Sequence, residues 1–188
     1  AWSVRVPDGP LVFTGAVTAA TAGDAAAESA AALVELDAVV RSAGGDAAGI
    51  ARVNAFVADD ADVPAVEAAV ARRFASAPVA FTLVRTPLAT AGRRVAFEAV
   101  ATAAGAPANV EIRGDRAAVL PAGGKVFVSG QAEKGADVAE AVRLTMAGLH
   151  RTLAHLGLRK TDVVQIGVQP YGADGSEIEF LHILGRRL

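Results

Sequence analysis

The feature that most constrains the fold is an internal repeat, in which one strand, helix and strand plan occurs twice along the chain. Residues 11–57 form the first copy and residues 125–168 the second. Each copy opens with an apolar stretch that ends in a hydroxyl residue and a glycine, VFTG in the first and FVSG in the second. A repeat of this kind indicates one supersecondary unit used twice. The apolar positions that match at an offset of 113 are Leu33 with Met146, Leu36 with Leu149, Val40 with Leu153, Ile50 with Val163 and Val53 with Ile166.

The first copy and its flanks predict the element order ββαβαββ. Residues 2–6 and 11–17 are separated by the turn residues PDGP, so they are expected to form a hairpin. Asp24 stands where it can cap a helix that ends at Gly44. A strand over 50–57, a helix over 64–74 and strands over 79–85 and 94–102 are predicted to follow. This order is typical of an α+β sheet with both helices on one face.

The succession of strand, SGQ, helix, glycine and strand resembles the RidA proteins, also called YjgF or endoribonuclease L-PSP proteins. The match is close at Ser129, Gly130 and Gln131. It extends over nearly all of the first copy through Ala101 and over most of the second, so the chain is similar to a tandem RidA protein. The resemblance implies an α+β fold of two RidA-like, chorismate-mutase-like units, each a mixed β-sheet with helices packed on one face.

The repeat predicts two domains of unequal content. Residues 1–103 are expected to form the first, 104–108 a flexible linker and 109–188 the second. Glu98 and Glu179 take the same place in the last strand of each copy, but their spacing falls short of the repeat offset by 32 positions, the length of one helix and one strand. We hypothesise that a segment between Tyr171 and Glu177 is missing from the sequence, which leaves an apparent gap near 171–176. An intact mass of 18.9 kDa would instead mean a shortened second copy.

Composition and charge narrow the function. Apolar residues make up 53% of the chain and its net charge is −2, which fits a globular protein with a buried core. No basic stripe is present, which disfavours nucleic acid as a partner and ribonuclease activity. Glu28, Glu35 and Asp37 interrupt the alanine-rich stretch, so a membrane span is not expected. With no cysteine and no signal peptide, a cytoplasmic location is the default expectation.

The resemblance implies hydrolysis of reactive enamines and imines of 2-keto acids, without a cofactor, in clefts between neighbouring units. This chemistry needs a cation for the substrate carboxylate and a polar group that positions water. The expected partners are a small carboxylate metabolite and further RidA-like units. The two copies are expected either to pack as a pseudo-dimer or to join other chains in the trimer-like ring of the family. By the resemblance, the catalytic candidates are Ser129, Glu179 and Glu98, and the substrate-binding candidates are Thr14, Gly15, Gly130, Gln131 and Arg85.

Each of these assignments has a structural alternative. The two glutamates also fit an exposed alternate position on an edge strand, and the hydroxyls of Thr14 and Ser129 also fit turn caps. The carboxylate-binding arginine of the family corresponds to Ala80, which offers neither charge nor hydrogen bond. Arg85 lies on the same strand, but its odd spacing from position 80 predicts the opposite face. A non-catalytic protein that binds a metabolite or partner is therefore the alternative function.

No metal site is predicted. His150 and His155 are five positions apart on the expected second long helix, too far round it to share an ion. Asp59, Asp60 and Asp62 lack the glycine and the distal glutamate of a calcium loop. These aspartates are expected to cap a helix.

Overall fold

The computed structural model describes residues 8–77, 79–131, 133–171 and 177–185. It divides the chain into two compact units, Ala1–Ala122 and Gly123–Leu188. The first unit contains β1 (Leu11–Thr14), α1 (Ala25–Ser42), β2 (Gly45–Val57), a 3-10 turn (Asp60–Asp62), α2 (Val63–Arg73), β3 (Ala80–Arg85), β4 (Val95–Ala103), β5 (Glu111–Arg113) and β6 (Ala117–Leu120).

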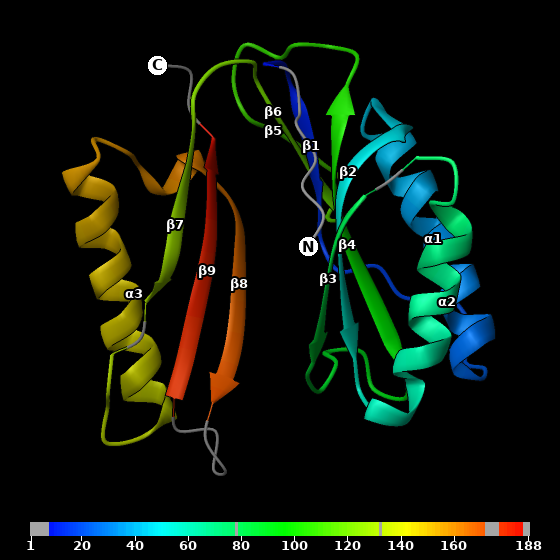
Figure 1. The fold of residues 1–188 in the computed structure, drawn as a ribbon. Helices are drawn as coiled ribbons and strands as arrows, with labels where there is room; N and C mark the ends of the chain where they lie inside the picture. Colours follow the sequence, from blue (N-terminus) through cyan, green and yellow to red (C-terminus); the bar gives the residue numbers. More distant parts are fainter. Residues whose placement is uncertain (1–7, 78, 132, 172–176, 186–188) are drawn as a thin grey trace. The chain divides into compact units, whose positions relative to one another are not determined.

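The first unit is built on a six-stranded sheet in the order β3-β2-β4-β1-β6-β5. β2 pairs with β3 in parallel, and every other neighbouring pair is antiparallel. Figure 1 shows α1 and α2 together on one face of this sheet. The α+β class, the mixed sheet and the one-sided helices predicted for the first copy are therefore confirmed.

The core of the first unit lies between the helices and one face of the sheet. Leu36 of α1, Val53 of β2 and Phe97 of β4 are all fully buried in it. Since successive strand side chains point to opposite faces, Val53 and Phe97 define the helix-covered face. The alternate residues of β2 and β4 therefore project from the other side, which we call the helix-free face.

Local chemistry fixes where α1 begins and where β2 follows it. The Asp24 carboxylate accepts a hydrogen bond of 2.8 Å from the Ala27 N–H, which confirms the predicted cap. Gly44 has φ of +81°, a conformation that favours glycine at a helix end. A Cβ at Gly45 would lie 2.8 Å from Cγ1 of Val40, so only glycine permits this close approach. β2 consequently begins at Gly45, ahead of the predicted start at position 50.

The boundary between the units differs from the predicted linker at 104–108. β6 pairs along β1, with Leu11 opposite Leu120, and β5 pairs with β6. These two strands lie in the range 109–188 that was assigned to the second domain, yet they complete the first sheet, and the division falls after Ala122. The expected hairpin strand at 2–6 lies outside the described residues. Within the described residues, β1 has β4 on one side and β6 on the other.

The second unit is smaller. It contains β7 (Lys125–Gln131), α3 (Val138–His155), a 3-10 turn (Lys160–Asp162), β8 (Val163–Tyr171) and β9 (Glu177–Gly185). Its sheet has the order β7-β9-β8 with both pairs antiparallel, so the described strands do not form the mixed sheet that was predicted. The predicted gap falls at 172–176, outside the described residues, and Tyr171 pairs directly with Glu177.

Candidate functional site

Three polar residues meet on the helix-free face of the first sheet. Arg52 and Asn54 alternate with buried Val53 on β2, and Asn54 is the antiparallel partner of Glu98 on β4. All three side chains are half-buried. We call Arg52, Asn54 and Glu98 the polar cluster. Such a group on a sheet face otherwise rich in apolar residues is a candidate site.

Hydrogen bonds join the three residues of the polar cluster in a chain, from Arg52 to Asn54 and from Asn54 to Glu98. Nε of Arg52 donates to Oδ1 of Asn54 over 3.1 Å. The Asn54 side chain is also hydrogen-bonded to Glu98, and with its oxygen occupied by Arg52 its amide NH2 is the donor to the carboxylate. Asn54 therefore holds the Glu98 carboxylate in place from the neighbouring strand.

The environment of Glu98 makes its carboxyl group more basic. Burial raises the pKa of Glu98 above its ordinary value of 4.5, because a charged carboxylate is poorly solvated there. The hydrogen bond from Asn54 and the charge of Arg52 oppose this rise without cancelling it. A carboxylate with a raised pKa is better suited to accept a proton from water near neutral pH.

This raised pKa predicts a pH-dependent gain in stability for Glu98→Gln. Between pH 4.5 and the raised pKa the folded state binds more protons than the unfolded state, so stability falls as pH rises through that interval. Glutamine cannot ionise, so the variant should melt at a higher temperature than the wild type at pH 7–8, and the difference should shrink towards pH 4.5. Melting curves across this range test it, with Glu111→Gln as control. A difference independent of pH would contradict the assignment.

Thr14 and Gly15 come close to Glu98 in the sheet, but their polar groups have structural partners. Oγ1 of Thr14 is fully buried and accepts a hydrogen bond of 2.9 Å from the N–H of Ala99, the residue after Glu98. The Gly15 N–H donates to the carbonyl of Arg116 over 2.8 Å. These bonds align β1 with β4 and β6, which favours the structural alternative for both residues.

Arg85 does not join the polar cluster. Its parallel partner on β2 is Val57, which is buried on the helix-covered side. The guanidinium of Arg85 lies 3.3 Å from Asp60. Asp59 caps the 3-10 turn through the Ala61 N–H, as predicted. Arg85 is therefore a surface ion-pair residue at the end of β3.

In the second unit, the candidate residues lie on two neighbouring strands, β7 and β9. Ser129, Gly130 and Gln131 end β7, where the pairing with β9 is irregular, and Gln131 is the partner of Phe180. Phe180 directly follows Glu179, whose own partner on β8 is Gln169. An amide residue thus stands opposite the last-strand glutamate in both sheets.

Arg52 and Asn54 were not predicted as site residues. The alternation in ARVNAFV indicates that they share one face of a strand. Their relation to Glu98 depends on the antiparallel register of two strands far apart in the sequence, which alternation does not provide. The pairing of β2 with β4 is what brings them together.

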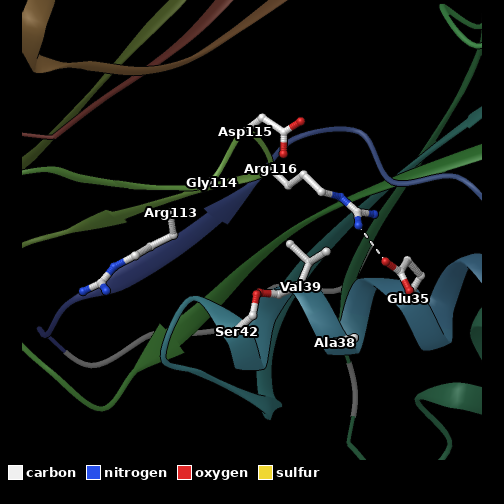
Figure 2. Close-up of a pocket in the computed structure, with 8 residues that line it drawn as sticks. All are labelled: Glu35, Ala38, Val39, Ser42, Arg113, Gly114, Asp115 and Arg116. Carbon is white, nitrogen blue, oxygen red and sulfur yellow. Dashed lines mark hydrogen bonds and ion pairs between the residues drawn. The ribbon is translucent and has the colours of Figure 1, made fainter.

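A groove of about 470 Å³ lies elsewhere on the first unit, between α1 and the turn that joins β5 to β6. Figure 2 shows Arg116 reaching from this turn to Glu35, with 2.6 Å between Nη1 and Oε1. Arg113 points away from that ion pair (Figure 2). No residue of the polar cluster lines this groove, and the guanidinium of Arg116 in it is already paired with Glu35. The polar cluster is therefore a better candidate site than the groove.

Among the described residues, no group of three or more histidine, aspartate or glutamate side chains is arranged to hold a metal ion. Within the same part of the chain, no helix is both long and apolar enough to span a membrane.

The comparisons with known proteins give similar structures only. A member of the YjgF/YER057c/UK114 family from Mycobacterium tuberculosis is 27% identical, with a TM-score of 0.47, over 52% of this chain and 81% of that protein. A Rid-family protein of unknown function from Yersinia pestis is 22% identical, with a TM-score of 0.48, over 53% and 84%. A YjgF-family protein from Neisseria meningitidis is 19% identical, with a TM-score of 0.48, over 56% and 96%. No family model and no curated protein matches the chain.

Proposed function

We propose that this chain hydrolyses reactive imines and enamines of small 2-keto acids, the activity that its RidA-like motifs imply. The observation that carries the proposal is the Glu98 carboxyl group. It lies half-buried on the helix-free face, has a raised pKa and is held by Asn54 beside a cation, Arg52. This is the environment that a water-activating carboxylate requires.

The polar cluster supports each proton transfer that the reaction needs. Water adds to the imine carbon, the carbon–nitrogen bond then breaks, and the products are the 2-keto acid and ammonia. Glu98 accepts one proton from the attacking water as the carbon–oxygen bond forms and passes it to the imine nitrogen, which gives a carbinolamine. It then accepts the proton of the new hydroxyl group and gives it to the amine, so that the carbonyl forms as the carbon–nitrogen bond breaks and ammonia leaves. Asn54 keeps the carboxylate oriented throughout, so the same group acts as base and then as acid.

The second unit supports a further site of the same kind. Ser129 and Gln131 end β7, which pairs with the strand of Glu179, and Gln169 is the register partner of Glu179 as Asn54 is of Glu98. We therefore propose that the chain is a tandem repeat in which either unit can hydrolyse the substrate. We also propose that the protein self-associates through its RidA-like units.

A second candidate function is favoured by Ala80. The absence of the family arginine at this position removes a charge-assisted bond to a substrate carboxylate. A protein that only binds a metabolite would bind a keto acid in calorimetry and would not accelerate ammonia release from an imine over a control without protein. Ammonia release thus separates this candidate from the hydrolase.

The wild-type protein is expected to accelerate the loss of 2-aminoacrylate and 2-iminobutanoate. This enamine and this imine are generated in place from serine and threonine by a dehydratase, and their loss is followed against a control without the protein. Each variant is tested separately. If Ser129→Ala and Glu179→Ala still accelerate the loss and Glu98→Gln does not, the reaction is assigned to the first unit. Unchanged imine loss at micromolar protein would contradict the hydrolase and favour the binding protein.

A further inference from the structure

The helix-free face lacks an arginine at position 80 but carries a cation beside it. Arg52 on β2 is the parallel register partner of Ala80 on β3. We infer that Arg52 supplies the guanidinium that binds the substrate carboxylate in this chain, reaching over Ala80 from the neighbouring strand. The inference rests on the proposed function, because it names the residue that selects carboxylated imines.

The register partners of Arg52 carry no charge. Neighbouring strands lie about 4.8 Å apart, a distance that an arginine side chain can cross. The residues directly opposite Arg52 on its two sides are Ala80 and Val100, so no carboxylate faces it across either strand pair. Position 80 itself carries only a methyl group, so no larger side chain stands at the register partner of Arg52.

The hydrogen-bonding capacity of Arg52 is only partly used. Its Nε is bonded within the sheet, yet in the described part of the chain neither of its Nη groups has a hydrogen-bond partner. Other arginines of the first unit use these groups on carboxylates. Nη2 of Arg73 donates to Asp37 over 2.8 Å, and Nη1 of Arg94 donates to both oxygens of Asp62. Arg52 is therefore an anchored guanidinium with its outer N–H groups available for a bidentate anion.

The position of Arg52 relative to Glu98 matches the shape of the substrate. In a 2-imino acid the reacting carbon is bonded directly to the carboxylate, so the groups that bind and react must be close together. Arg52 lies two residues before Asn54, the register partner of Glu98, which makes Arg52 and Glu98 diagonal neighbours across one strand pair. A carboxylate held by Arg52 therefore brings the imine carbon towards Glu98.

Calorimetric titration with 2-ketobutanoate, the stable product of the proposed reaction, tests the inference. Arg52→Ala is expected to weaken binding about ten- to a hundred-fold, because a charge-assisted pair is lost. Arg52→Lys should lose less affinity, since lysine keeps the positive charge but cannot donate two parallel hydrogen bonds to the carboxylate. The double variant Arg52→Ala, Ala80→Arg should recover affinity by placing a guanidinium on the register partner. Arg85→Ala is the matched control, and the uncharged 2-ketobutanamide should bind equally weakly to wild type and Arg52→Ala.

The outcomes separate this inference from the proposed function. Binding that is lost in Arg52→Ala and recovered in the double variant supports Arg52, even if no imine is hydrolysed. Imine hydrolysis with unchanged KM in Arg52→Ala would support the function and overturn the inference. Wild-type protein that binds no 2-ketobutanoate at millimolar concentration would also overturn it. Melting curves of each variant confirm that the compared proteins are folded.

Discussion

Replacing Glu98 by glutamine is expected to slow the hydrolysis of 2-iminobutanoate about a hundred-fold or more, the size typical of losing a general base. Glutamine keeps the length of the side chain and can still bond to Asn54, so the sheet register should not change. What it loses is the ability to accept a proton from water. The same variant should be more stable at neutral pH, because the half-buried charge is removed. Lost turnover combined with raised melting temperature is the expected signature.

Two other glutamate-to-glutamine variants serve as controls for Glu98→Gln. Glu111→Gln alters a half-buried glutamate of β5 that is paired with Arg113, far from the polar cluster in the strand order, so it should leave the rate unchanged. Glu179→Gln reports the contribution of the second unit. A Glu98→Gln protein with the wild-type kcat would remove Glu98 from the mechanism, and a loss of rate only in Glu179→Gln would move the site to the second sheet.

Phe97→Ala is expected to lower the free energy of unfolding of the first unit by about 3–5 kcal/mol. Phe97 is fully buried on β4, which lies between β1 and β2 in the sheet and faces α1. Removing its ring leaves a cavity among side chains from both the helices and the sheet, which can close only in part. Urea unfolding followed by far-UV circular dichroism measures the change.

Val34→Ala is the matched control for Phe97→Ala. Val34 lies on α1 with 71% of its surface exposed, so its truncation creates no cavity. It should change the stability by less than about 0.5 kcal/mol. A similar small loss in Phe97→Ala would contradict the described core, because it would mean that the ring is not enclosed by the helices.

Much of the first unit could be predicted from local sequence signals. The Asp24 cap, the stop at Gly44 and the apolar spacing of α1 each act within a few residues, and the structure has the helix at Ala25–Ser42. The partner of β1 could not be found in this way. The stretch at 2–6 and the stretch that forms β6 have similar strand patterns, and only long-range pairing decides which of them lies beside Leu11.

The candidate site was predictable to a smaller extent. Glu98 follows from the resemblance of its strand to the last strand of RidA proteins, but Arg52 and Asn54 belong to a different strand. Their role depends on the cross-strand registers of β2 with both β3 and β4, to which no local pattern corresponds. The sequence shows that Ala80 replaces the arginine of the family. That Arg52 lies beside Ala80 is known only from the pairing of β2 with β3.

The proposed hydrolysis of 2-keto acid imines is best tested by the rate at which 2-iminobutanoate is lost in the presence of wild-type protein. Micromolar protein is expected to accelerate this loss over the control without protein, with ammonia and 2-ketobutanoate formed in equal amounts. A rate equal to that of the control would rule out the proposed hydrolase activity.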